Sequence, residues 1–190
     1  MAGFILEHLF SFILLTYICA NFAYSIKLKQ VVIIDIMVIA LGFVLRVLAG
    51  TILVGVSPSD WLITCPIAIS LFLGFSKRRQ ELVLGERNVN NQRRVLRNYS
   101  LPFLDQMIAV VTGCTVISYA LYTVSSETIA RFGTRNLVLT IPFVLYGIFR
   151  YLYLVYHKVS GENPTEMIMK DSPSIVNVVF WFVVVLIVIY

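Results

Sequence analysis

Residues 31–56 read VVIIDIMVIALGFVLRVLAGTILVGV, an apolar run that only two charged side chains, Asp35 and Arg46, interrupt. A helix needs about 20 mostly apolar residues to cross the hydrocarbon core of a bilayer, where every backbone N–H and C=O must be satisfied within the helix. The run is long enough for this. It therefore predicts a transmembrane helix.

Five similar runs accompany it, at about 4–22, 60–76, 102–124, 136–156 and 174–190. The 190-residue chain is 59% hydrophobic and 13% charged, with a mean hydropathy of +0.88. These values lie outside the range of soluble domains. The sequence predicts an all-α polytopic membrane bundle of about six transmembrane helices, forming a single domain over residues 1–190. The first run lacks a basic leader and a good cleavage site, so we interpret it as a span rather than a signal peptide.

The basic residues are distributed unevenly between the expected loops. Loops at about 23–30, 77–101 and 157–173 contain eleven Lys or Arg residues, whereas the loops at 57–59 and 125–135 contain two. Basic loops stay on the cytoplasmic side of a membrane. We therefore expect a multi-pass protein of the inner (plasma) membrane, with both termini outside and its active face cytoplasmic.

The segment from Lys77 to Arg97 holds most of the net positive charge. In a soluble protein such a segment would suggest nucleic acid, but no nucleic-acid partner is expected for a chain of this composition. Two interpretations stay open: a topology determinant that touches anionic lipid headgroups, or a phosphate-binding site. The 25 residues of the loop at 77–101 exceed what a plain helix connection needs, which favours the second interpretation.

Four charged residues lie within the apolar runs: Asp35, Arg46, Asp105 and Arg150. Each needs a partner or a water-filled cavity, because a charge inside the bilayer costs about 2.5–3.5 kcal/mol on insertion scales. Asp35 and Arg46 are eleven residues apart, which places them nearly on one helix face. Asp35 and Asp105 also lie near enough to the run ends to be interfacial residues.

The fifth run carries a second pattern. Tyr146, Arg150, Tyr153 and His157 follow i, i+4, i+7, i+11 spacing and predict an aromatic and cationic helix face. An interfacial tyrosine belt with a snorkelling arginine explains the same residues equally well.

Two loop patterns predict additional helical structure. The i, i+4 pair Lys77 and Glu81 predicts that the third helix continues beyond residue 76. Asn163, Pro164 and Glu166 occupy the cap, N1 and N3 positions of a helix start and predict a short helix that ends near Asp171.

Several functional classes find no support in the sequence. The chain lacks GxxxxGK[ST], GxGxxG, HExxH and GxSxG, which argues against nucleotide hydrolysis, Rossmann cofactors, zinc proteolysis and serine hydrolysis. Cys19, Cys65 and Cys114 all lie in apolar runs without ligand spacing, so we expect no disulfide and no metal–thiolate site.

Five segments and Asp35, taken in order, resemble the carboxy-terminal two thirds of the UbiA prenyltransferase superfamily. The resemblance is to the branch that includes decaprenyl-phosphate phosphoribosyltransferase. The segments are YSIKLK at 24–29, GFVLRVLAG at 42–50, KRRQEL at 77–82, RY at 150–151 and EMIMKD at 166–171.

This resemblance implies nine helices around a cavity that opens sideways to lipid, with polar chemistry at its cytoplasmic mouth. It also implies that a polyprenyl phosphate attacks C1 of phosphoribosyl pyrophosphate in the presence of Mg²⁺, releases pyrophosphate and serves cell-wall biosynthesis. The partners implied are thus the membrane, a polyprenyl phosphate lipid and phosphoribosyl pyrophosphate.

The resemblance also assigns roles to individual residues. The catalytic candidates are Lys77, Arg78, Glu81 and Asp171. The candidates for binding substrate phosphates are Lys29, Arg46 and Arg150. Those expected to shape the pocket or orient the cations are Tyr24, Asp35, Tyr151 and Asp171. Glu81 and Asp171 are the candidate Mg²⁺ ligands, since Mg²⁺ prefers carboxylate and phosphate oxygens.

One departure from the superfamily pattern is large. The first aspartate-rich motif, NDxxDxxxD, and the three amino-terminal helices have no counterpart in this sequence. We therefore expect a truncated UbiA-like bundle, a fragment or one half of a split enzyme, whose missing helices come from a second chain or a homo-oligomer. Alone it should insert into the membrane and show little or no transferase activity. Rival functions are prenyl transfer to an aromatic or other acceptor, a non-catalytic membrane subunit, and a transporter or channel.

Overall fold

The computed structural model describes residues 2–56, 58–85, 94–157 and 164–190, and these contain helices and no strand. The long helices are α1 (Ala2–Ile26), α2 (Ile34–Val54), α3 (Asp60–Gly85), α4 (Leu101–Val124), α6 (Ile141–His157) and α8 (Ser172–Ile189). The short ones are η1 (Leu28–Gln30), η3 (Arg94–Asn98), α5 (Ser126–Phe132), η4 (Asn136–Thr140) and α7 (Pro164–Lys170). The predicted all-α class is confirmed.

Six helical segments are long and apolar enough to cross a membrane, as the sequence predicts. Two helices extend well beyond the ends of their apolar runs. Helix α1 continues to Ile26 and α3 continues to Gly85, which shortens the expected loops at 23–30 and 77–101. Neither extension contains a proline. The sequence suggested that these helices end earlier only because the residues after each apolar run are more polar. The extension of α3 is the one that Lys77 and Glu81 predict.

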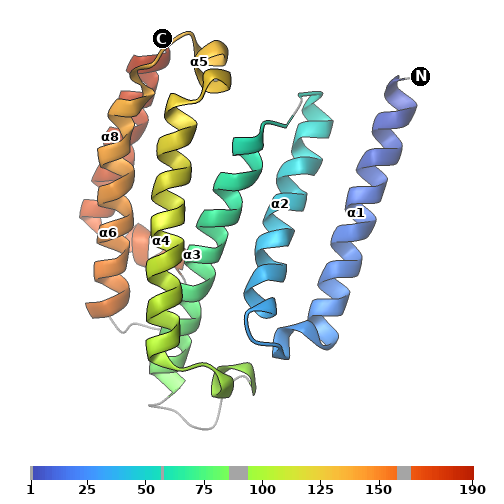
Figure 1. Ribbon diagram of the computed structural model, residues 1–190, viewed down its shortest axis with the longest axis vertical. Helices are drawn as coiled ribbons and strands as arrows, with labels where there is room; N and C mark the ends of the chain where they lie inside the picture. The colour runs from blue at the N-terminus through green and yellow to red at the C-terminus, as the bar shows by residue number, and fades with distance from the viewer. Residues whose placement is uncertain (1, 57, 86–93, 158–163) are drawn as a thin grey trace.

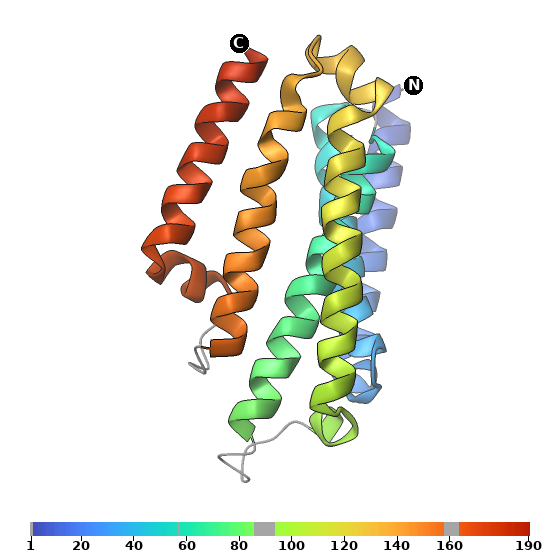
Figure 2. The ribbon, with the colours of Figure 1, turned by 60° about the vertical axis from the view of Figure 1, so that its left-hand side comes forward.

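The long helices stand side by side in an open arc. In chain order α1 packs on α2, α2 on α3, α3 on α4, α4 on α6 and α6 on α8. Figure 1 shows α1 at one side of the arc and α6 with α8 at the other, and Figure 2 shows α8 as the outermost helix of its side. Both termini lie at one end of the bundle, which we call the terminal end (Figure 1). The opposite end, where α1 joins α2 and α3 ends, is called the basic end.

Local sequence explains how several helices begin and end. Ser100 caps α4 by accepting the Phe103 N–H, and Asp171 caps α8 by accepting the Ser174 N–H. Gly55 ends α2 in the left-handed conformation that glycine adopts at low cost. Helix α7 begins at Pro164 as predicted, although its expected cap Asn163 lies outside the described residues.

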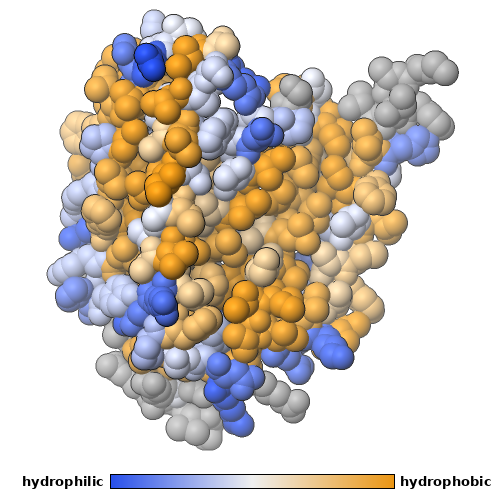
Figure 3. All heavy atoms as spheres, viewed as in Figure 1, coloured by the Kyte–Doolittle hydropathy of each residue, from blue (hydrophilic) through white to orange (hydrophobic). Residues whose placement is uncertain are grey.

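The outer surface is that of a protein in lipid. Figure 3 shows hydrophobic side chains covering much of one face between the two ends, with hydrophilic ones gathered mainly toward the ends. Leu53, Val54 and Ile187 are 71%, 76% and 73% exposed, which a soluble protein would rarely tolerate over so wide an area. The exposed apolar surface therefore supports the membrane assignment independently of helix length.

The tightest packing between α2 and α3 lies near the basic end. A Cβ at Gly74 would come within 2.5 Å of Ile36 Cγ2, so only glycine allows this approach. Ile36 is fully buried, and its neighbour Asp35 is therefore carried into the interface with α3. This crossing positions the polar residues described next.

Candidate functional site

A cavity of about 900 Å³ lies among α2, α3, α4, α6 and α7. Its walls are mostly aliphatic and aromatic side chains, including Ile36, Ile39, Phe43, Ile69, Leu73, Val144 and Ile148. Among the described residues, the charged side chains that line it are Lys77, Arg78 and Glu166, which belong to the basic-end part of α3 and to α7. Most of the cavity wall is thus apolar and could accept a hydrocarbon chain. We call the part lined by Lys77, Arg78 and Glu166 its mouth.

The hydroxyl groups on the cavity wall are already hydrogen-bonded to protein. Ser70 donates to the Pro66 carbonyl and Thr115 donates to the Val111 carbonyl at 2.7 Å. The Tyr119 hydroxyl lies 2.7 Å from Thr140 Oγ1 and accepts a hydrogen bond from the Trp181 indole N–H at 3.1 Å. Because these groups are satisfied, the interior offers few polar contacts to a ligand away from the charged mouth.

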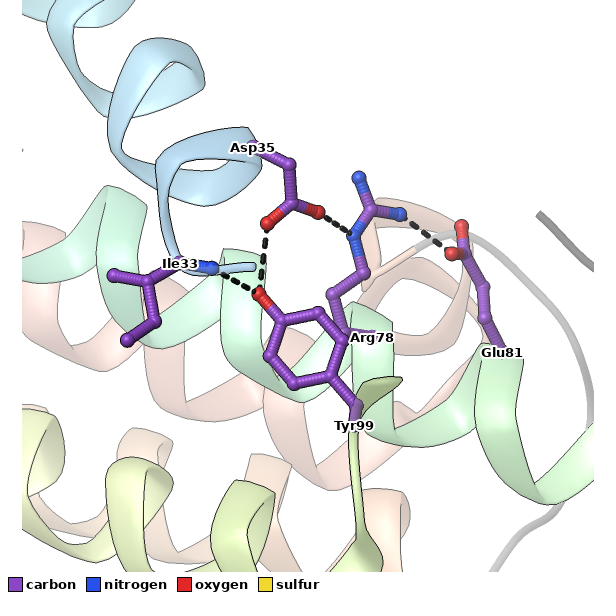
Figure 4. Close-up of polar contacts among 5 residues, drawn as sticks. All are labelled: Ile33, Asp35, Arg78, Glu81 and Tyr99. Atoms are coloured by element: carbon purple, nitrogen blue, oxygen red, sulfur yellow. Dashed lines mark hydrogen bonds and ion pairs between the residues drawn. The ribbon is translucent and has the colours of Figure 1, made fainter. Parts of the chain in front are cut away.

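Arg78, which lies at this mouth, belongs to what we call the Arg78 cluster: Asp35, Arg78, Glu81 and Tyr99 (Figure 4). Arg78 donates through Nε to Asp35 Oδ2 at 2.7 Å and through Nη1 to Glu81. The Tyr99 hydroxyl donates to the other Asp35 oxygen at 2.7 Å. Asp35 is 0% and Arg78 3% exposed, so this is a buried ion pair whose partners depend on each other.

Tyr99 also stabilises an unusual backbone. Ile33 has a φ of 70°, a conformation that a β-branched residue adopts only under strain of about 1–3 kcal/mol. Its N–H donates to the Tyr99 hydroxyl at 2.7 Å. Burial raises the pKa of this hydroxyl above its ordinary value, so it stays protonated and can donate to Asp35. The start of α2 is therefore fixed by a residue from the far end of the basic loop.

The Arg78 cluster leaves one guanidinium nitrogen, Nη2, without a partner among the described residues. Two of the three guanidinium nitrogens bind carboxylates, and Nη2 donates to no described residue. Figure 4 shows this third nitrogen without a dashed line. Since Arg78 lines the cavity next to Lys77, an anion in the mouth can accept from both side chains.

The neighbouring arginine forms a second cluster, which we call the Arg79 cluster: Arg79, Asp105 and Tyr156. Arg79 donates to Asp105 at 2.6 Å, and the Tyr156 hydroxyl donates to the same oxygen at 2.9 Å. The guanidinium carbon of Arg79 lies 3.9 Å from the centroid of the Tyr156 ring. None of the three lines the cavity.

Arg150 and Asp171 pair with each other away from the cavity. Arg150 donates to both Asp171 oxygens, at 2.9 and 2.7 Å, and Ser174 donates to Oδ2 through its N–H and hydroxyl. The Arg150 hydrogen bonds lower the pKa of the Asp171 carboxyl well below its usual range. The guanidinium carbon of Arg150 also lies 5.1 Å from the Tyr153 ring centroid, as the predicted helix face requires.

Tyr151 lines a smaller cavity of about 300 Å³ between α3, α6 and α8. Its ring packs on Phe72 with centroids 5.4 Å apart, and its buried hydroxyl has no hydrogen-bond partner among the described residues. The smaller cavity shares lining residues with the larger one, such as Ile69 and Val144.

The remaining predicted site residues lie elsewhere. Arg46 is hydrogen-bonded to Tyr17 of α1 and lies eleven residues along α2 from Asp35, which is about 16 Å of helix. Tyr24 is half-buried on α1 and Lys29 is exposed in η1, and neither lines the cavity. The structure thus brings together Asp35, Lys77, Arg78 and Glu81 and separates the other candidates from them.

Sequence reasoning missed Tyr99, which is central to the Arg78 cluster. It lies 64 residues from Asp35 in the chain, and a single tyrosine after a basic loop has no distinguishing pattern. It also missed Glu166 as a cavity-lining residue, having assigned it to the start of a short helix.

The described residues do not by themselves make a magnesium site. They contain no group of three or more His, Cys, Asp or Glu side chains able to hold a metal ion. Glu81 gives one oxygen to Arg78, and both Asp171 oxygens accept hydrogen bonds from Arg150 and Ser174. Mg²⁺ usually needs one or two available carboxylates as well as substrate phosphates, so its role here stays a prediction.

No protein-family model matches the chain. Three curated proteins named decaprenyl-phosphate phosphoribosyltransferase are similar to it. That of Mycolicibacterium smegmatis is 28% identical over 84% of this chain and 52% of its own length. That of Corynebacterium glutamicum is 28% identical over 92% of this chain and 52% of its own length. That of Mycobacterium tuberculosis is 26% identical over 84% of this chain and 51% of its own length.

The chain spans about half the length of the curated relatives it matches. The similar stretch covers most of this chain, including the segments that carry the resemblance to the UbiA superfamily. The resemblance that the ordered motifs indicated is therefore confirmed: over most of its length this chain is similar to proteins named decaprenyl-phosphate phosphoribosyltransferase.

Proposed function

We propose that the chain belongs to a membrane transferase that moves phosphoribose from phosphoribosyl pyrophosphate to a polyprenyl phosphate. The observation that carries this proposal is the cavity, which is apolar along most of its wall and has Lys77 and Arg78 at its mouth. A polyprenyl phosphate has the same division, with a long hydrocarbon chain and a dianionic head. The names of the relatives support phosphoribosyl transfer to a polyprenyl phosphate.

In this proposal the chain orients two phosphate groups against each other. The polyprenyl phosphate oxygen attacks C1 of the ribose, the bond from C1 to the pyrophosphate oxygen breaks, and pyrophosphate leaves with its bonding electrons. Lys77 and the remaining donor of Arg78 hold phosphate oxygens in the mouth, where fixed positive charge stabilises the leaving group. Asp35 and Tyr99 hold Arg78 in position. The basic loops support a cytoplasmic mouth.

A binding role without chemistry is the second candidate. The absence of a metal-holding group among the described residues favours it, since the departing pyrophosphate carries charge that basic side chains alone stabilise only in part. We expect the isolated chain to bind polyprenyl phosphate and to transfer little or no phosphoribose.

The first test is lipid binding by the chain reconstituted in bilayers, measured with a photoreactive polyprenyl phosphate. Lys77→Ala should weaken labelling about ten-fold, because a charge-assisted hydrogen bond contributes about 1.5–3 kcal/mol. Lys170→Ala is the matched control, since Lys170 is exposed and does not line the cavity. Equal labelling of both variants and wild type would contradict the proposed site.

The second test supplies labelled phosphoribosyl pyrophosphate, polyprenyl phosphate and Mg²⁺, and follows label into extracted lipid. Transfer with a longer relative but not with this chain alone would fit our expectation. Transfer by this chain without another polypeptide would show that its own carboxylates suffice. Label passing instead from a prenyl pyrophosphate into an aromatic acceptor would replace the phosphoribosyl assignment with the prenyltransferase one.

A further inference from the structure

Arg46 has no counter-charge among the residues that the structure describes. Its Nε and Nη2 donate to the Tyr17 hydroxyl at 3.2 and 2.6 Å, and its guanidinium carbon lies 5.3 and 5.2 Å from the Tyr17 and Phe43 ring centroids. No carboxylate of the described residues forms an ion pair with it. Every other arginine of the described spans is paired with an acidic residue.

The position of Arg46 makes this absence costly. It lies twelve residues after Ile34 and eight before Val54 in α2, which is about 18 Å and about 12 Å of helix from the two ends. The side chain is exposed and does not line the cavity, so no packed interior surrounds it. A charge at such depth is costly on any scale and normally faces a partner or a wet cavity. Tyrosine contacts reduce the cost without cancelling the charge.

Arg46 also lies in the middle of an exposed stripe along α2. Ile39, Phe43, Arg46, Gly50 and Leu53 recur at helical spacing, and the three apolar side chains among them are 36%, 45% and 71% exposed. Nothing lies within 4 Å of where a Cβ on Gly50 would be. A small residue between larger exposed ones allows another helix to approach closely within a membrane.

A second copy of this chain does not supply the missing charge. The acidic residues described within its spans are Asp35, Asp60, Glu81 and Asp105. Each lies within five residues of a helix end, and all but Asp60 are already paired with Arg78 or Arg79. None is at the depth of Arg46. Lipid chains carry no charge, and a phosphate bound at the mouth lies about 16 Å of helix away, near Asp35.

We propose that the α2 stripe centred on Arg46 is an interface for a different transmembrane helix that carries a Glu or Asp near its middle, opposite Arg46. The carboxylate and the guanidinium neutralise each other inside the bilayer, and Gly50 lets the two helices pack closely. Ile39 and Phe43 at one end of the stripe also line the cavity, whereas Arg46, Gly50 and Leu53 do not. The proposed ion pair therefore lies outside the Lys77 and Arg78 mouth and does not depend on the transferase assignment.

The test uses synthetic transmembrane helices as the probe. The chain is reconstituted in lipid nanodiscs with a fluorescent leucine-alanine helix of about 21 residues, long enough to span the bilayer, carrying one central Glu or one central Gln. Association is measured by energy transfer to a dye on the chain's C-terminus. The Glu helix should associate about ten-fold or more tightly than the Gln helix with the wild-type chain.

Variants assign the preference to Arg46. Arg46→Gln should abolish the Glu over Gln preference, and Arg46→Lys should keep most of it. Arg131→Gln, which removes an exposed positive charge at the terminal end, should leave it unchanged. Equal association of both helices with the wild-type chain overturns the proposal, as does a preference that persists in Arg46→Gln. If Arg46→Gln fails to fold, as judged by circular dichroism, the wild-type comparison of the two helices decides alone.

Discussion

Arg78 and Arg79 are adjacent in the sequence and make nearly the same bonds, yet they stand in different surroundings. Each donates Nε–H to an aspartate that also accepts a tyrosine hydroxyl. In the Arg78 cluster the arginine is 3% and the aspartate 0% exposed, whereas in the Arg79 cluster the values are 13% and 38%. Successive residues of a helix are about 100° apart, so one cluster faces the cavity and α2 while the other faces α4 and α6.

This difference teaches that the bonding pattern alone does not set the importance of an ion pair. A buried pair is expensive to break, because the remaining partner is left charged in a low-dielectric site. A partly exposed pair is replaced by water at little cost. We therefore expect the Arg78 cluster to dominate stability although the Arg79 cluster has bonds of similar length.

The largest expected effect on stability comes from removing the carboxylate of Asp35, and removal of the Asp105 carboxylate is the comparison. Asp35→Ala should lower the free energy of unfolding by about 3–5 kcal/mol, because it leaves Arg78 buried with only Glu81. Asp105→Ala should lower it by at most about 1 kcal/mol. Unfolding of both variants by sodium dodecyl sulfate in mixed micelles, followed by circular dichroism, measures the difference. Equal losses would show that burial does not distinguish the clusters.

The next effect concerns the helix crossing that places Asp35 beside Arg78. Gly74→Ala should destabilise by up to about 3 kcal/mol, because the new methyl group overlaps Ile36. Gly113→Ala is the matched control on α4, with no atom within 4 Å, and should be neutral or stabilise by up to about 1 kcal/mol. The same micelle titration compares them. A neutral Gly74→Ala would mean that α2 can move away without breaking the cluster.

A smaller effect is expected for the two tyrosine hydroxyls. Tyr99→Phe leaves an Asp35 oxygen and the strained Ile33 N–H without a partner, at a cost of about 1–2 kcal/mol. Tyr156→Phe removes one hydrogen bond at an exposed site and should cost less than about 0.5 kcal/mol. Melting temperatures of the purified variants rank the two. A larger loss of stability for Tyr156→Phe than for Tyr99→Phe would contradict the expectation that the Arg78 cluster contributes more than the Arg79 cluster.

The smallest effect tests a third pair, Arg150 and Asp171, which is intermediate in exposure at 26% and 4%. Asp171→Asn keeps a capping residue at the start of α8 and removes the charge, so it should cost about 1 kcal/mol at neutral pH. The folded chain lowers the pKa of this carboxyl, so ionisation stabilises the fold above the ordinary carboxyl range. That contribution is lost as the pH falls through and below about 3.9.

Stability of wild type and Asp171→Asn measured from pH 7 down to about pH 3 should therefore converge. Arg150→Gln is the complementary variant and should show the same convergence. A difference that grows as the pH falls would mean that the pair is not ionised in the folded chain.

The length of the apolar runs was sufficient to predict the six long helices, because lipid imposes a long apolar run on every span. Helix ends were less predictable. The apolar run of α3 ends near residue 76, but the helix continues to Gly85 because Lys77, Arg79 and Glu81 favour helix whether or not lipid surrounds them.

The candidate site was predictable only where one helix carries several of its residues. Lys77, Arg78 and Glu81 come together because they share a turn of α3, whereas Asp35 depended on the insertion cost of a charge within a span. The hydrogen bond of Tyr99 to Asp35 and the pairing of Arg150 with Asp171 depend on how distant segments pack. The spacing of residues along the chain does not indicate such packing. Arg46 was grouped with the phosphate binders on charge alone, and its depth along α2 separates it from them.

The open arc has a consequence for how the protein is made. Each long helix packs against the long helix before it in the chain. During translation, each new long helix can therefore pack on one that has already been made. A nascent chain that has been translated through α4 would already contain four of the six long helices, with every residue of the Arg78 cluster present. The wall contributed by α6 and α7 would be absent until these helices have been translated, and only then would the cavity close on that side.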